Sequence, residues 1–124
     1  MKVDKGETVT QVLLGVPVVF SLLLMAIQGA VFFHTANVAS VVAAQSAAAG
    51  AALDGGLLPA LDTAARTIAE LSGQSDSLPQ AVITADEVVV TVHLRVPQVA
   101  PFFSFTATRV AHEPLERYLS EVER

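Results

Sequence analysis

The sequence contains no cysteine. Its absence excludes a disulfide framework and any metal site built on thiolates. The chain has only 124 residues, which leaves room for one small domain and not for a large catalytic cleft. We therefore expect the folded part to be held together by the packing of side chains alone.

Basic residues are also scarce. Seven Lys and Arg stand against twelve Asp and Glu, which gives a formal net charge of -5 at pH 7. Lys2 and Lys5 come first, Arg66 is the next basic residue, and the acidic excess lies downstream. Because nucleic-acid binding depends on clustered Lys and Arg, we expect no nucleic-acid partner.

Residue sets for catalysis or metal binding are missing as well. His34, His93 and His112 form no pair at metal-ligand spacing, and there is no HExxH motif. The serines lack a GxSxG context, and no glycine-rich phosphate loop is present. The sequence predicts no catalytic residue, no metal and no cofactor, so we expect a protein that is not an enzyme.

Residues 12–33 carry no Asp, Glu, Lys or Arg. As a helix they would rise by roughly 33 Å, which is enough to cross a hydrocarbon core of about 30 Å. Their Val, Leu, Ile and Phe residues outweigh Pro17, Ser21 and Gln28 on the insertion scale. The sequence predicts a single membrane span here.

The flanks of this span predict its orientation. Lys2 and Lys5 lie just before it, and positive charge near a span favours the cytoplasmic side. The N-terminus is therefore expected inside and the chain from His34 onward outside. A cleaved secretory signal with a mature start between residues 30 and 46, preceding a small secreted enzyme or inhibitor, is the alternative. The apolar run exceeds the usual length of about 7–15 residues for such a signal.

Residues 34–52 continue without a helix breaker and consist mainly of small side chains. They predict one helix from near Thr8 to Ala52, about 67 Å long, with a bend or loosened turn at Pro17. Residues 54–56, Asp-Gly-Gly, supply the stop. The expected inward stripe of its second half consists of Val31, Val38, Val42, Gln45, Ala49 and Ala52.

Residues 57–71 predict a second, amphipathic helix, with a cap at Gly73. Asp62, Arg66 and Glu70 are spaced four apart and are expected on its solvated face. Its predicted buried stripe comprises Leu57, Leu61, Ala64, Ala65, Ile68 and Leu71.

Three extended segments follow. Val82 and Ile83 predict a brief strand, and residues 88–96 alternate between aliphatic and other side chains in the manner of a half-buried strand. A third run covers residues 103–110, with Phe103, Phe105 and Ala107 on one side. From Pro114 a terminal helix is expected, with Leu115, Tyr118, Leu119 and Val122 along one face.

The predicted fold class is α+β. A long N-terminal transmembrane helix continues into a small domain with a second helix and a three-stranded antiparallel sheet. We divide the chain into a cytoplasmic leader (residues 1–6), the long helix (7–54, with its transmembrane half at 12–33) and an extracytoplasmic α+β domain (55–124).

The junction between leader and apolar helix resembles the processing site of type IV pilin-like proteins, because Lys5-Gly6 ends a polar leader directly before the helix. Further segments look like TadE-type minor pilins and pseudopilins of actinobacterial Tad (Flp) pili. They are residues 6–14, Val16-Pro17, Gln28, His34, the Ala-rich run to Gly50, and residues 95–97, 105–108 and 113–118.

The resemblance implies a pilin-like fold and a role in assembling a Tad/Flp-type surface filament for adhesion or secretion. A prepilin peptidase would cut between Gly6 and Glu7 on the cytoplasmic side, with Lys5 and Gln11 as further residues of the processing site. Other pilin subunits, the membrane and a pilus assembly platform would be the partners, and the bacterial cytoplasmic membrane or an extracellular pilus the location. Helix packing would use Val12, Leu13, Val16, Pro17 and Phe20.

Gln11 departs from the family pattern, which usually has Glu at this position. A glutamine accepts a hydrogen bond but does not cancel the charge of a neighbouring terminal amine. We interpret it as a sign of a scarce or tip-located subunit. The alternative function is a single-span anchor whose outer domain binds a partner in an unrelated envelope complex.

Overall fold

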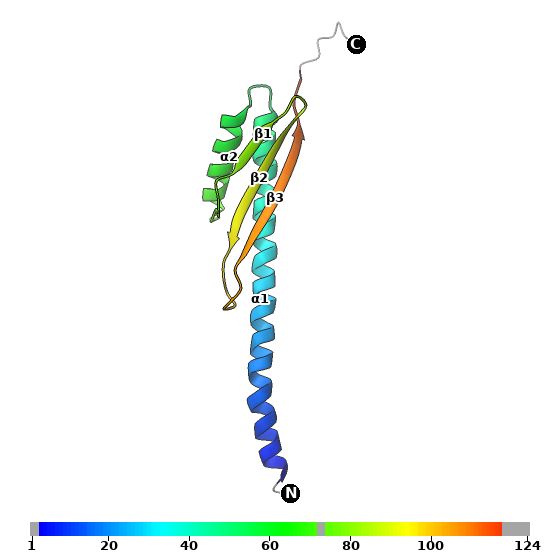
Figure 1. The fold of residues 1–124 in the computed structure, drawn as a ribbon, viewed down its shortest axis with the longest axis vertical. Helices are drawn as coiled ribbons and strands as arrows, with labels where there is room; N and C mark the ends of the chain where they lie inside the picture. Colours follow the sequence, from blue (N-terminus) through cyan, green and yellow to red (C-terminus); the bar gives the residue numbers. More distant parts are fainter. Residues whose placement is uncertain (1–2, 72–73, 118–124) are drawn as a thin grey trace.

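The computed structural model describes residues 3–71 and 74–117. A long helix α1 (Val3–Ala51) is followed by a shorter helix α2 (Leu57–Glu70). Three strands come next: β1 (Gln80–Ile83), β2 (Glu87–Val96) and β3 (Phe105–Pro114). The α+β layout predicted from the sequence is confirmed, and Figure 1 shows the domain gathered around the C-terminal half of α1.

Helix α1 runs without interruption through Pro17. The prediction that it begins near Thr8 is wrong, because the helix already starts at Val3. No proline or other strong breaker separates residues 3–7 from the apolar run, so nothing ends the helical pattern there. The Ser21 hydroxyl donates a hydrogen bond of 2.7 Å to the Pro17 carbonyl, four residues back.

The two halves of α1 differ in what covers them. From residue 5 to residue 27 the side chains are exposed, except at the half-buried Gly15 and Leu24. From Gln28 onward, buried positions recur at helical spacing to the end of the helix. The first half is therefore a bare apolar rod, and the second half is the spine of the domain.

A tight turn closes α1. The amide of Gly55 donates to the Ala52 carbonyl at 2.8 Å, and that of Gly56 donates to the Gly50 carbonyl at 3.0 Å. A Cβ atom on Gly55 would lie 2.4 Å from the Gly50 oxygen, and Gly56 has a φ of 130°. The predicted stop is thus present, and it depends on both glycines.

The three strands form an antiparallel meander in the order β1-β2-β3. Val90 of β2 lies opposite Ala81 of β1 and Ala111 of β3. The predicted alternation of β2 is confirmed, since all five of its aliphatic positions on one face are buried: Val88, Val90, Val92, Leu94 and Val96.

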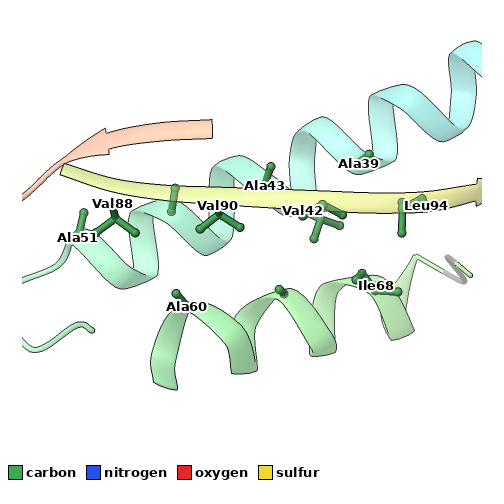
Figure 2. Packing of buried hydrophobic residues seen from close by; sticks show 12 residues of the cluster. Ala39, Val42, Ala43, Ala51, Ala60, Ile68, Val88, Val90 and Leu94 are labelled. Carbon is green, nitrogen blue, oxygen red and sulfur yellow. The ribbon is translucent and has the colours of Figure 1, made fainter. Parts of the chain in front are cut away.

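The core lies where this face of β2 meets both helices (Figure 2). Most of the α1 and α2 contributions are alanine, which lets the helix backbones approach closely. The approach is close at Gly50, because a Cβ there would lie 3.0 Å from the Ala60 Cβ atom and 3.1 Å from Val88. The helix contributions to the core are Ala39, Val42, Ala43, Ala47, Ala51, Ala60, Ala64 and Ile68.

This close packing corrects both predicted helix stripes. In α1, Val42 of the predicted stripe is buried, but Gln45 and Ala52 are exposed. Four residues of the predicted second-helix stripe are exposed: Leu57, Leu61, Ala65 and Leu71. The face of α2 that meets α1 contains Ala60 instead, because a Cβ at Gly50 would lie 3.0 Å from the Ala60 Cβ atom and leaves no room there for leucine. The residues of α2 that are buried are Ala60, Ala64, Thr67 and Ile68. The predicted cap Gly73 lies outside the described residues.

The predicted end of the chain also needs correction. Strand β3 covers Phe105–Pro114 and not residues 103–110, because it pairs with the whole of β2. Pro114 ends this edge strand opposite Glu87 and does not open a helix. Leu115 packs on the core, and the amide of Glu116 donates to the Ala51 carbonyl at 2.9 Å. The rest of the predicted terminal helix, residues 118–124, lies outside the described residues.

Candidate functional site: the bare half of α1 and its junction with the domain

The residues predicted for processing lie on the first turns of α1. Lys5, Gly6, Glu7 and Gln11 are all exposed. The Thr10 hydroxyl donates to the Gly6 carbonyl at 2.9 Å. A Cβ atom on Gly6 would meet no atom within 4 Å, so the fold itself does not require glycine at this position.

The residues predicted for helix packing are exposed on the same rod. Val12, Val16 and Phe20 come together along one side of it. With Gly15, Val19 and Leu23 they line a shallow apolar groove of about 390 Å³. Leu13, which is 72 % exposed, and Pro17 do not line this groove. The rod thus presents apolar surface on every side rather than one prepared face.

Gln28 ends the bare rod and joins it to the domain. Its side-chain amide nitrogen donates to the Pro97 carbonyl at 3.1 Å. Its amide oxygen accepts from the backbone N–H of Val99 at 2.7 Å and of Ala100 at 3.1 Å. Only 5 % of Gln28 is exposed. One side chain therefore satisfies three backbone groups of the connection between β2 and β3.

Sequence reasoning missed this role, because it treated Gln28 as a cost to membrane insertion and as one position of a family resemblance, and not as a contact with the domain. A signal was present, since Thr35, Val42 and Ser46 follow Gln28 at helical spacing and all are buried. A polar side chain at the start of a stripe that faces a sheet is expected to be buried, and buried polar groups need hydrogen-bond partners. Thr35 and Ser46 instead donate to carbonyls one turn back in α1.

Aromatic side chains pack around the same junction. Phe32 of α1 meets Phe105 of β3 edge to face, with ring centroids 6.2 Å apart. Phe103 stacks on Phe105 at 6.0 Å. Residues 97–104, which we call the β2–β3 loop, are the part of the domain closest to the N-terminal half of α1 (Figure 1).

A polar cluster lies where the segment before β1 runs alongside the end of β2, with Ser75 in an antiparallel bridge to Leu94. Arg95 donates to Asp76 with its Nη2 at 2.9 Å, and the Thr106 hydroxyl donates to the other carboxylate oxygen at 2.6 Å. The Thr106 hydrogen bond, followed by that of Arg95, lowers the pKa of Asp76 below its ordinary value of 3.8. The cluster ties three segments together.

The histidines are dispersed over the surface. His34 is exposed on α1, the His93 ring lies 2.8 Å from the Thr108 hydroxyl, and His112 lies 3.4 Å from Glu87. Within residues 3–71 and 74–117, no group of three His, Cys, Asp or Glu side chains is placed to hold a metal ion.

By length and composition, α1 is a helix that is able to cross a membrane. It is compatible with a single N-terminal membrane anchor that continues into an α+β domain. Comparisons with protein-family models, with curated proteins and with solved structures find no match to this chain.

Proposed function

We propose that this protein is a minor pilin or pseudopilin of the Tad (Flp) type, anchored in the bacterial cytoplasmic membrane with its domain outside. It takes part in pilus assembly and is not an enzyme. The observation that carries the proposal is one helix that is bare and apolar over its first half and is the spine of a small domain over its second.

The dimensions of the bare rod support membrane anchorage. Residues 9–27 rise by about 28 Å, close to the roughly 30 Å of a hydrocarbon core. This stretch replaces residues 12–33 as the proposed span, because Gln28 is buried against the β2–β3 loop. Every residue of this stretch is uncharged. Such a rod is unstable in water, since its Val, Leu and Phe side chains remain largely exposed. Lipid covers it before assembly, and the helices of sibling subunits cover it afterwards.

The core argues against a cleaved secretory signal. A cut between residues 30 and 46 would separate Gln28 from the β2–β3 loop. Depending on the cut site, it would also remove Ala39 and Val42, which are fully buried in the core. A mature protein that loses part of its own core is not a stable product.

The N-terminal junction supports processing by a prepilin peptidase. Gly6 is exposed, uncovered and not required by local packing, although glycine weakens a helix by about 1 kcal/mol relative to alanine. A requirement of the peptidase for a small residue at its cut site would explain why glycine is present at position 6 despite this cost. Glu7 would then be the first mature residue.

Gln11 favours the second candidate function, a single-span anchor that binds a partner in another envelope complex. It is exposed on the bare rod and brings no negative charge to neutralise a neighbour's terminal amine inside an apolar bundle. Under the pilin proposal, Gln11 instead fits a subunit present in few copies, with Glu7 supplying a carboxylate nearby.

The N-terminal residue of the protein isolated from its native membrane separates these functions. We expect mass spectrometry to find a chain that starts at Glu7, and expect Gly6→Leu to leave the full-length form in the membrane. Gly15→Leu is the matched control, because a Cβ at either glycine meets open space. It should be processed normally.

An intact N-terminus in the wild-type protein would favour the unrelated anchor. Processing of Gly6→Leu as efficient as that of Gly15→Leu would argue against the peptidase, and normal surface filaments in cells without this chain would remove the role in assembly.

A further inference from the structure

The β2–β3 loop, residues 97–104, exposes an apolar tip. The loop contains no charged residue. Phe102 is 96 % exposed, and Val99 and Phe103 are each more than a third exposed. Phe102 also has a φ of 71°, a left-handed conformation that bulky residues rarely adopt. A large aromatic side chain held outward in this way is costly in water.

The loop lies at the level where the bare rod ends. Three hydrogen bonds from Gln28 fix its backbone to α1 at that point. Gln28 is also the first buried residue after the long exposed stretch of α1. If residues 9–27 span the hydrocarbon core, the loop lies at the boundary between that core and the headgroups.

A hollow beside the loop continues the apolar surface of the rod. It has a volume of about 320 Å³. The only amide side chain in its wall is that of Gln28, whose hydrogen bonds go to the loop backbone. The lining residues are Met25, Gln28, Gly29, Phe32, Ala100, Phe103 and Phe105.

Charged groups begin on the far side of the loop. Asp76 and Arg95 line a separate, polar hollow together with Gln98 and Ser104. Polarity therefore increases from the tip of the loop toward the sheet. This is the order of environments met on leaving a bilayer, from acyl chains through the interface to water.

We propose that the β2–β3 loop is a second membrane contact: its tip inserts into the outer interfacial layer of the bilayer that α1 crosses, and lipid acyl chains fill the hollow beside Met25 and Phe32. This inference rests on the membrane anchorage proposed above. Continuity with the lipid-covered rod selects a phospholipid bilayer as the partner. The second contact sets the rotation and tilt of the domain on the membrane, so that a defined side of α1 faces sibling subunits.

Fluorescence quenching tests the insertion, because the chain has no tryptophan. Phe102→Trp, in the full chain reconstituted into phosphatidylcholine–phosphatidylglycerol vesicles, places a single reporter at the tip. Leu58→Trp, at an 81 % exposed position of α2, is the matched control. Val19→Trp reports on the rod. Val99→Trp is a second tip reporter whose backbone hydrogen bond to Gln28 is retained.

We expect the tryptophan emission of Phe102→Trp and Val99→Trp to be blue-shifted, to be quenched by lipids brominated on the acyl chain, and to be protected from quenching by iodide. Leu58→Trp should show the reverse. Iodide quenching of the tip together with bromolipid quenching of Val19→Trp would overturn the loop contact and leave the anchorage intact. A tip that neither quencher reaches is covered by protein, such as a second copy, which also overturns the lipid contact. An unquenched Val19→Trp would overturn the anchorage itself.

Discussion

At the residue scale, Gln28 links α1 to the β2–β3 loop through three hydrogen bonds. Its side chain bonds to the Val99 and Ala100 amides and to the Pro97 carbonyl, and of these three residues Ala100 is buried. A buried backbone group left without a partner costs about 1–3 kcal/mol, whereas water can replace a partner at the exposed Pro97 and Val99. Gln28 therefore makes a polar attachment between the β2–β3 loop and α1, beside the aromatic packing of Phe32 on Phe105.

Replacing Gln28 by alanine should lower the free energy of unfolding of the domain by about 1–3 kcal/mol. It should also speed hydrogen exchange at the amides of Val99 and Ala100. Denaturant unfolding in detergent and exchange measured by mass spectrometry check both effects. Gln11→Ala, at an exposed site, is the control and should stay within about 0.5 kcal/mol of the wild type. Equal behaviour of the two variants would contradict the role of Gln28.

Asp76 gives the domain a pH dependence of defined sign. Its pKa is lowered in the folded state by Thr106 and Arg95, so folding favours the ionised carboxylate. The resulting stabilisation is fully present above the ordinary pKa of 3.8 and is lost as the pH falls through the lower, folded-state value.

The melting temperature of the wild type should exceed that of Asp76→Asn near neutral pH, and the difference should shrink as the solution is acidified below about pH 4. Thr106→Val should remove the larger part of this pH-dependent difference, since Thr106 is the main cause of the shift. Circular dichroism melts across this pH range provide the measurement. A difference that stays constant with pH would show that Asp76 is not stabilised in its ionised form.

At the element scale, α1 owes its two functions to a change in side-chain size along one helix. Its first half carries large apolar residues, which suit lipid and neighbouring helices. Its second half presents alanine and Gly50 to β2 and α2, and these small residues allow close contact. The turn that follows is equally tight, because Gly55 lies against the carbonyls of Ala49 and Gly50.

Gly55→Ala should therefore destabilise the domain by about 1–3 kcal/mol, because a Cβ 2.4 Å from the Gly50 oxygen forces the backbone to move. Gly29→Ala is the control. Its Cβ meets open space within α1, and replacing glycine in a helix is neutral or stabilises it by up to about 1 kcal/mol. Thermal unfolding of both variants is the measurement. A Gly55→Ala protein as stable as Gly29→Ala would contradict the claim that the turn has no room for a Cβ atom at position 55.

The elements differ in how well the sequence predicts them. The buried face of β2 was predictable, because side chains alternate between the two faces of a strand whichever strands pair with it. The buried face of α2 was not, since Leu61 suggests burial by hydrophobicity while the space against Gly50 admits only Ala60. The length of β3 was not predictable either, because its register on β2 sets its end at Pro114.

The candidate site was predictable where it depends on composition and not where it depends on contacts. An exposed apolar rod follows from the uncharged run that contains Val12 and Phe20. The bond network of Gln28 joins residues about seventy positions apart in the chain, and no local pattern indicates such a partner.

At the scale of the whole molecule, the bare rod and the spine of the domain are the two halves of one continuous helix, α1. Under the proposed function, a subunit built in this way transmits the orientation of its domain to the half of α1 that lies in lipid. Lateral packing of the rods would then be coupled to contacts between the outer domains, which would select the neighbour that fits. A hinge between the halves would break this coupling.

Hydrogen exchange of the full chain in lipid nanodiscs tests this continuity most directly. The account predicts that the amides of residues 24–38, where α1 leaves the rod and enters the domain, exchange as slowly as those of the core segment 39–51. Rapid exchange confined to residues 24–38 would reveal a water-exposed break between the two halves and would contradict the account.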